Sequence, residues 1–381
     1  MVDQSFNSSE EFSRNPLEEI KAFFRKMQPE DLHNGAWFEK LLSFALFNYQ
    51  NKVTADYFQK EYPGLPPDAI VDLRIALAKK YAAISGGTTG AAYTAAVAAT
   101  IGTAGGASPV MIPGAIVTLV ADLGYTSLLQ LRLAHDISVL YGHPLDYQDP
   151  QDLIDLINLA FGVEAGETLH RGLQRLSPEF VRVFIKNTIK GSSLEWLKAL
   201  PVVGKYLLQR NIIKAGIPVV GIVLGVGLNY YMTGQIGKRA RTKFRRRAAI
   251  EEAVRDFPLD EVQNMHLLLD LIWLAIFADK EATRPEAWFL RAFITRIQER
   301  GSISDLENYS KQVNFDKEKI LNQLSICSIE ERQTLFNAVC IAVVVDGIST
   351  DTELTFVREV AHRADVMLDE EALRELVKKF R

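Results

Sequence analysis

YAAISGGTTGAAYTAAVAATIGTAGGASPVMIPGAIVTLVA, residues 81–121, decides the fold because it is a long stretch without a single charged side chain. Small residues recur in it at intervals of four, and this spacing places them on one face of an α-helix. Such a face lets a second helix approach closely, in membranes and in water alike. The stretch therefore predicts closely packed helices. The residues of this small-residue ridge are Gly86, Gly90, Thr94, Ala98, Gly102 and Gly106.

The second half of the stretch is more apolar and contains Pro109 and Pro113. Because a proline disfavours helical conformation in the residue before it, the pair predicts a bend near residues 108–114 and hence a helical hairpin. Three interpretations stay open: a soluble helical core, a hairpin in reversible contact with a membrane, and a stable membrane span. The first half has few strongly apolar residues to offset its glycines and hydroxyls, which argues against insertion of that helix alone.

Patterns outside this stretch also predict helices, so the expected fold class is all-α. Residues 1–80 should form amphipathic helices that pack on the next domain, and the YPGLPPD segment at residues 62–68 should break them. A helical domain built around the hairpin is expected over residues 81–250. A second helical domain is expected over residues 255–381.

Charge is distributed unevenly along the chain, although the net charge is only -4. Residues 81–250 carry 17 basic and 10 acidic side chains, whereas residues 251–381 carry 16 basic and 25 acidic ones. The basic middle predicts an anionic partner, and the acidic end predicts a cation or a basic partner. The alternative is that the two parts dock on each other. No nucleic-acid partner is expected.

The two cysteines, Cys327 and Cys340, are too far apart for a close-spaced metal-binding pair. Their number excludes a disulfide framework and a cysteine zinc site, and it agrees with a reducing cytoplasm. The polar, acidic N-terminus does not resemble a signal peptide. We therefore expect a cytoplasmic protein.

A second membrane candidate is the uncharged run at residues 215–237, which a strongly basic segment follows. Basic residues directly after an apolar run are typical of contacts with anionic lipid. A solvated helix held in place by Ala240, Phe244 and Ala248 explains the same pattern equally well. The candidate lipid-binding residues are Lys238, Arg239, Arg241, Lys243, Arg245, Arg246 and Arg247.

No catalytic motif is present: the sequence contains no G-x-S-x-G elbow, no Walker loop and no H-E-x-x-H. Asp122 is the most unusual polar residue, because it lies within a helix that is apolar nearly all round. A carboxylate there needs a hydrogen bond or a cation, such as Lys214 or Arg132, or else it stays protonated. If the protein is an enzyme, Asp122, Arg132 and His135 are its candidate site residues.

Three segments together resemble the EcsC family of bacterial proteins: GGTTGAAYTAAVAATIGTAGG, ADLGYTSLLQLRLAHDISVLYG and IPVVGIVLGVGLNYYMTGQIGKRARTKFRRR. The resemblance covers about residues 75–250. It implies an all-helical domain with a glycine-rich centre, an Asp and an Arg at the positions of Asp122 and Arg132, and a Tyr-Gly pair at Tyr141-Gly142. It implies no catalytic residue.

Two later segments, LLLDLIWLAIFADKEATRPEAWFLRAFITRI and LFNAVCIAVVVDGISTDTELTFVREVAHRA, align as a pseudo-repeat. Their apolar-helix, Asp-Gly-x5-Glu, helix arrangement resembles the tellurite-resistance domain TerB over residues 260–381, except that Lys280 replaces the Gly in the first copy. The resemblance implies a helical, acidic module of a stress response, with a cation-binding or membrane-proximal signalling role. The candidate ligands of a divalent cation are Asp279, Glu286, Asp346 and Glu353.

Both glutamates also have an explanation without a metal. Thr283 with Glu286, and Thr350 with Glu353, match the capping box that closes a helix N-terminus. The loops also lack the alternating oxygen ligands of an EF-hand. Helix capping and cation binding therefore stay open as alternatives, and no other cofactor is expected.

These observations predict a non-enzymatic adaptor that binds a membrane surface, through anionic lipid or through a membrane protein. We expect it to be peripherally attached, with integral insertion of the hairpin as the less favoured possibility. The alternative is an enzyme that acts on lipid or another apolar substrate near Asp122.

Overall fold

The computed structural model describes residues 20, 23, 26–28, 30, 31, 36–46, 49–102, 111–145, 152, 156, 159, 221–279, 282–300 and 316–381. Within these ranges, the side chains of residues 85–123, 221–226 and 228 are not described. The described residues form helices and connecting turns and no strand, which confirms the all-α prediction. The chain divides into two units: unit 1 comprises residues 1–163 and 193–241, and unit 2 comprises residues 164–192 and 242–381.

Short helices precede the hairpin in unit 1: α4 (Trp37–Leu46), α5 (Tyr49–Lys52) and α6 (Ala55–Glu61). The Thr54 hydroxyl caps α6 by accepting a hydrogen bond from the N–H of Tyr57. Helix α4 is amphipathic, as predicted: it buries Trp37, Phe38 and Leu41 and exposes Glu39 and Lys40. Most of residues 1–35, for which amphipathic helices were also predicted, lie outside the described residues. A turn with Gly64 in the left-handed region, at φ 76°, separates α6 from the next helix.

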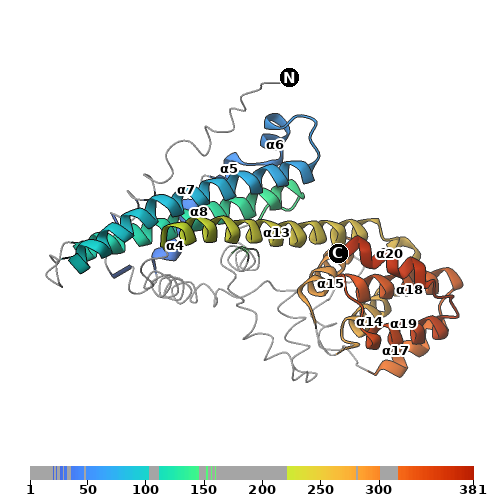
Figure 1. Cartoon of the computed structure of the whole chain (residues 1–381). Coiled ribbons are helices and arrows are strands. Elements are labelled where there is room, and N and C mark those ends of the chain that lie inside the picture. The colour runs from blue at the N-terminus through green and yellow to red at the C-terminus, as the bar shows by residue number, and fades with distance from the viewer. Residues whose placement is uncertain are drawn as a thin grey trace. The chain divides into compact units, whose positions relative to one another are not determined.

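The predicted hairpin is formed by α7 (Pro67–Gly102) and α8 (Met111–Leu140). The two long helices lie side by side and run in opposite directions (Figure 1). Pro113 lies within α8 and not in the bend where we expected it, whereas residues 108–110 of the expected bend lie outside the described residues. The α8 helix ends, as predicted, before Gly142, whose φ is 81°.

The small-residue ridge lies on α7 as far as Gly102, while Gly106 lies outside the described residues. Since the side chains of this part of α7 are also outside them, the packing role of the ridge stays a prediction.

Helix α13 (Gly221–Asp256) begins in unit 1 and ends in unit 2. Its first part approaches α7 closely at Gly237, where a Cβ atom would lie 2.6 Å from Cγ1 of Ile75. At Gly234, an added Cβ would lie 3.2 Å from the side chain of Lys79. A Cβ atom at position 237 would therefore force the helices to shift, whereas at position 234 the flexible Lys79 side chain could move aside. Small residues thus bring these two helices of unit 1 together.

In unit 2, the end of α13 is followed by short helices: η2 (Leu259–Glu261), α14 (Met265–Ile276), α15 (Arg284–Glu299), α17 (Lys317–Leu324), α18 (Ile329–Val344), α19 (Asp351–Ala364) and α20 (Glu370–Phe380). The predicted capping boxes are present at both positions. The Thr283 N–H donates to Glu286 Oε2 at 2.5 Å, and the Thr350 N–H donates to Glu353 Oε2 at 2.7 Å. Around α14 and α18, these helices enclose one apolar core.

Candidate functional site

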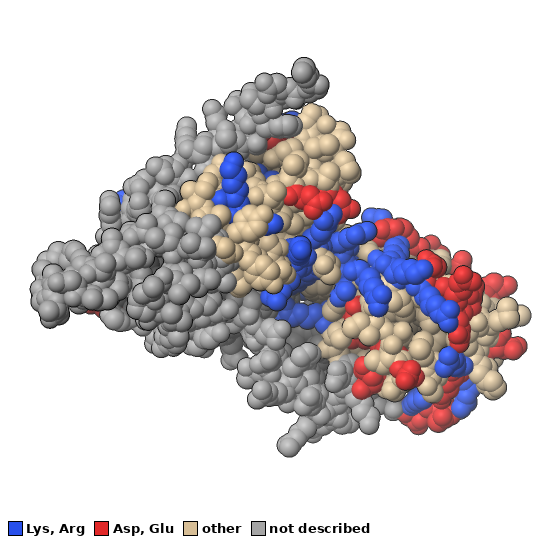
Figure 2. All heavy atoms as spheres, in the orientation of Figure 1, with Lys and Arg blue, Asp and Glu red and all other residues tan. Residues whose placement is uncertain are grey.

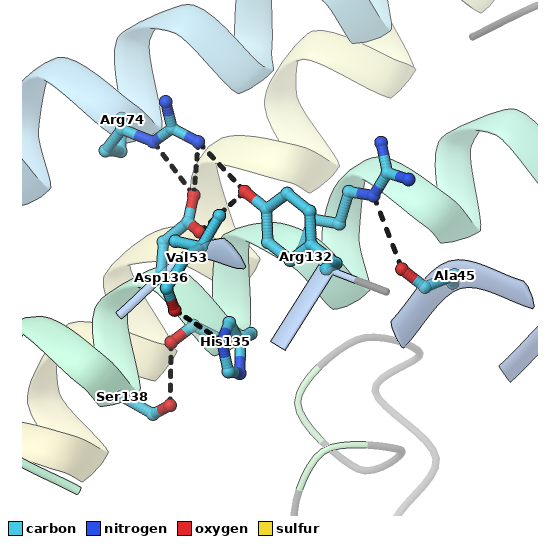
Figure 3. Close-up of polar contacts among 8 residues, drawn as sticks. Ala45, Val53, Arg74, Arg132, His135, Asp136 and Ser138 are labelled. Carbon is cyan, nitrogen blue, oxygen red and sulfur yellow. Dashed lines mark hydrogen bonds and ion pairs between the residues drawn. The ribbon is translucent and has the colours of Figure 1, made fainter. Parts of the chain in front are cut away.

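A buried polar network joins three helices of unit 1 (Figure 3). Arg74 on α7 donates from Nε to Oδ2 of Asp136 on α8 at 2.8 Å, and its Nη2 lies 2.7 Å from the same oxygen. The hydroxyl of Tyr49, on α5, donates to Asp136 Oδ1 at 2.7 Å and accepts from Arg74 Nη2 at 3.0 Å. Both carboxylate oxygens and the phenol hydroxyl are thus hydrogen-bonded.

The electrostatics of this network keep Arg74 charged and Tyr49 neutral. Burial is the largest single influence and lowers the pKa of the Arg74 guanidinium, but the attraction of Asp136, its hydrogen bond and the nearby tyrosine oxygens together outweigh it, so the pKa lies above its ordinary value. Burial and the negative charge of Asp136 together raise the pKa of Tyr49 well above its ordinary value. An ion pair with a neutral phenol therefore holds α5, α7 and α8 together.

The candidate catalytic residues lie near this network but face the protein interior. His135 is 1% exposed, and its Nε2 lies 3.2 Å from the carbonyl oxygen of Val53. Burial lowers the pKa of His135, which favours the neutral imidazole. Arg132 Nε donates to the Ala45 carbonyl oxygen at 3.4 Å, and its guanidinium lies 4.8 Å from the centroid of the Tyr49 ring. These contacts are those of residues that stabilise a fold.

The structure brings His135 and Arg132 into one cluster. It does not show whether Asp122 pairs with Arg132 or with Lys214, as the sequence predicted. The side chain of Asp122 lies outside the described residues, and so does Lys214. The charged residues that sequence reasoning missed are Arg74 and Asp136. Like Asp122, Asp136 is a carboxylate within the apolar helix α8 and therefore needs a hydrogen-bonded or cationic partner, a signal that the sequence contains.

A second polar cluster lies closer to the surface, where the first turns of α7 meet α13 and the residue that follows α8. Arg241 donates to Asp68 at 3.1 Å and to Asp72 at 2.7 Å, and the Tyr141 hydroxyl donates to Asp68 at 2.5 Å. Burial, and next the hydrogen bond to Asp68, raise the pKa of Tyr141 to about 12. This cluster fixes the alignment of α7 with α8 and with α13.

The seven candidate lipid-binding residues, all on α13, divide into two groups. Arg241 is paired as above, Arg246 donates to the Phe380 carbonyl oxygen at 2.7 Å, and Arg247 pairs with Glu251 at 3.3 Å. Lys243 lies over the ring of Trp288, as does Arg247. The members of the second group are exposed: Lys238, Arg239 and Arg245.

Lys238 and Arg245 lie on the side of the helix opposite to its buried face, and Arg239 lies about 100° around the helix from Lys238. Ala240 and Phe244 are fully buried, so the solvated-helix interpretation describes the inner side of this segment correctly. The intervals between Tyr231, Lys238 and Arg245 are seven residues, which places these side chains on one outer face. In Figure 2, Lys and Arg side chains gather where Figure 1 draws α13.

Family comparison assigns part of this architecture. The profile of the EcsC protein family matches residues 97–248. This segment is an EcsC domain. Neither the curated proteins nor the solved structures gave a match to the chain.

The EcsC domain contains the last turns of α7, all of α8 and the basic part of α13. Asp136, Tyr141 and the three exposed cations therefore belong to it. The residues that bond to Asp136 (Tyr49 and Arg74) and to Tyr141 (Asp68) precede it. The comparisons do not support the resemblance of residues 260–381 to TerB. No described helix combines the length and the apolar composition needed to cross a membrane.

The four candidate cation ligands of unit 2 are close enough to influence one another. Burial, and to a lesser degree the charges of Asp346 and Glu353, raises the pKa of Glu286 to about 8 despite its bonds to Thr283. Burial also raises the pKa of Asp346 and of Glu353, and in both cases Asp279 adds to the shift. Among the described residues, no group of three or more His, Cys, Asp or Glu is disposed to hold a metal ion. Cation binding here stays a prediction.

Proposed function

We propose that this protein binds anionic membrane surfaces peripherally, as a non-enzymatic adaptor whose EcsC domain makes the lipid contact. The observation that carries the proposal is the exposure of Lys238, Arg239 and Arg245 on the outer side of α13. The neighbouring carboxylates Asp68 and Asp72 already pair with Arg241. The exposed cations are therefore available to lipid phosphate.

The expected strength of this contact is moderate. Each Lys or Arg near an anionic leaflet contributes about 1 kcal/mol, so three of them contribute about 3 kcal/mol. That free energy corresponds to an affinity in the millimolar range or weaker, which is insufficient for permanent attachment. Binding by these residues alone should be reversible and should weaken as salt shortens the Debye length.

The enzyme alternative is not proposed, because no contact of the described residues favours it. His135 and Arg132 bond to backbone carbonyl oxygens and pack against Tyr49. These interactions engage Arg132 Nε and His135 Nε2, while the side chain of Asp122 lies outside the described residues.

Co-sedimentation with vesicles tests the proposal. The full chain should sediment with vesicles of phosphatidylcholine and phosphatidylglycerol, and it should bind more weakly to phosphatidylcholine alone or at high salt. Changing Lys238, Arg239 and Arg245 to Gln should reduce binding about a hundredfold, from the loss of about 3 kcal/mol.

A matched control removes the same number of charges elsewhere. Lys52, Lys60 and Lys319 are also exposed and lie outside α13. Their replacement by Gln should leave vesicle binding within about twofold of the original, because lipid contact depends on position and not on net charge alone. Equal losses in both triple variants would contradict the proposed contact surface.

A further inference from the structure

In the three long helices of unit 1, namely α7, α8 and the first part of α13, the charged residues end at the same height along the helix axes. The ion pair of Arg74 with Asp136 sets the alignment of α7 with α8. The contacts of Lys79 with Gly234 and of Ile75 with Gly237 set the alignment of α7 with α13. Since all three helices rise by the same length per residue, Lys79 lies level with Gly234 and with about residue 131 of α8.

Beyond this level, towards the hairpin bend, the helices carry almost no charge. Residues 81–102 of α7 and residues 221–237 of α13 contain no Asp, Glu, Lys or Arg. Between Met111 and Leu131, α8 contains only Asp122. The boundary is therefore a property of the assembled helices and not of one amphipathic segment.

Cationic side chains mark the charged side of the boundary. Lys80, Lys238 and Arg239 are exposed there, and Lys79 is half-buried. The Lys79 ammonium lies 4.2 Å from the centroid of the Tyr230 ring. The only described carboxylates near this level on α7 and α8, Asp72 and Asp136, are paired with arginines.

Aromatic and aliphatic side chains mark the other side. Tyr230 is 47% exposed, Tyr231 is 60% exposed, and Ile84 is 55% exposed. Tyrosine is enriched where a bilayer meets water, and lysine next to it extends its amine towards the lipid headgroups. The sequence of apolar, aromatic and cationic side chains along the helix axes is that of an interfacial boundary.

We propose that the hairpin end of unit 1 points into an anionic bilayer, with its interfacial boundary at Tyr230, Tyr231 and Ile84. Lys80, Lys238 and Arg239 then contact lipid phosphates directly. Arg245 lies about 10 Å further from the bilayer along α13, so of the three cations proposed above it contributes only long-range attraction, over about one Debye length. This orientation rests on the proposed membrane binding and specifies it. If α13 instead lay flat on the surface, Arg245 would be as deep as Tyr231.

Depth-dependent quenching tests this orientation. An environment-sensitive fluorophore is attached to single cysteines introduced at Ile84, Tyr231, Arg245 or Leu65, in a full chain with Cys327→Ser and Cys340→Ala. Leu65 is 41% exposed and precedes α7, so it serves as the control at the charged end. Circular dichroism verifies that each labelled chain keeps its helices.

Labelled chains are mixed with vesicles of equal parts phosphatidylcholine and phosphatidylglycerol that carry a nitroxide on the acyl chain. Labels at Ile84 and Tyr231 should be quenched at least about fivefold more than labels at Arg245 and Leu65, because quenching falls steeply outside the acyl region. Chains that sediment with the vesicles but show no quenching at Ile84 and Tyr231, or equal quenching at Arg245, overturn the orientation and leave the proposed function intact. Chains that do not sediment overturn both.

A second variant tests the boundary without a label. Ile84→Ser combined with Tyr231→Ser should weaken binding to these vesicles about tenfold or more, since two apolar side chains no longer enter the bilayer. Leu65→Ser should leave binding unchanged. If the Ile84→Ser, Tyr231→Ser chain keeps its helicity and binds as well as the Leu65→Ser chain, the inference is overturned. The protein would then contact the membrane through the charges of α13 alone.

Discussion

The Arg74 guanidinium and the Asp136 carboxylate lie 2.7 Å apart inside unit 1, and only 1% of each side chain is exposed. Removing two charges from water costs several kcal/mol for each, so attraction alone does not make such a pair stabilising. The pair is supported by the Tyr49 hydroxyl, which bonds to both partners. Because the three residues come from different helices, the pair fixes how these helices align.

Breaking this pair should destabilise unit 1 strongly. In Asp136→Ala, the Arg74 charge stays buried without its counterion, and we expect a loss of about 3 to 5 kcal/mol in the free energy of unfolding. Urea denaturation followed by circular dichroism measures it. The double variant Arg74→Met with Asp136→Leu should recover much of that loss, because no buried charge remains. A loss below about 1 kcal/mol in Asp136→Ala would contradict a structural role for the pair.

The sequence was sufficient for features that depend on neighbouring residues. The turn at Gly64, the end of α8 before Gly142 and the two capping boxes follow from local chemistry, and the structure has them. The pairing of Arg74 with Asp136 joins residues 62 positions apart. It depends on the alignment of two antiparallel helices, which no local pattern determines.

The basic segment shows the same limit in a different way. Its composition predicted seven lipid-binding cations, but the packing of α13 leaves Lys238, Arg239 and Arg245 exposed. Which residues of a basic helix face inward depends on its neighbours, such as the Phe380 carbonyl oxygen that accepts from Arg246. A variant that changes Arg246 would therefore confuse lipid binding with stability.

The close approach of α13 to α7 should make Gly237 intolerant of a side chain. In Gly237→Ala, the new methyl group would lie 2.6 Å from Ile75 Cγ1, and separating the helices should cost about 1 to 3 kcal/mol. Gly227 is the matched control on the same helix, since a Cβ there would have no atom within 4 Å. Gly227→Ala should stabilise by up to about 1 kcal/mol through helix propensity alone. Thermal melts of both variants measure the difference, and the same sign in both would contradict the close approach.

The stability of an isolated fragment of unit 2 should depend on whether it includes the end of α13. Ile250 and Val254 lie on α13, are 0% and 3% exposed, and belong to the apolar core of unit 2. A fragment of residues 242–381 should therefore unfold cooperatively, at a higher temperature than the predicted domain of residues 255–381. Omitting two buried aliphatic side chains should cost several kcal/mol. Identical melting curves of the two fragments would show that α13 adds nothing to this core.

Glu286 connects the stability of unit 2 to pH. Its side chain is 2% exposed, and burial is the main reason that its pKa rises from 4.5 to about 8. Its hydrogen bonds with Thr283 favour the charged form but do not outweigh burial. At neutral pH, the folded protein therefore holds a proton on Glu286 that the unfolded chain has released.

The free energy of unfolding should consequently decrease as the pH rises from about 4.5 to about 8, because the folded state binds the additional proton over that interval. The contribution of Glu286 is fully present below its unfolded pKa and is lost as the pH passes through its folded pKa.

Urea denaturation of the full chain at several pH values measures this slope. Glu286→Gln keeps the shape of the side chain without titrating, and should reduce the slope; Asp346 and Glu353, whose pKa values are also raised, should retain part of it. Glu330→Gln, at an exposed position in the first turn of α18, should keep the original slope. If Glu286→Gln kept it as well, Glu286 would be charged in the folded protein, with its hydrogen bonds from Thr283 outweighing burial.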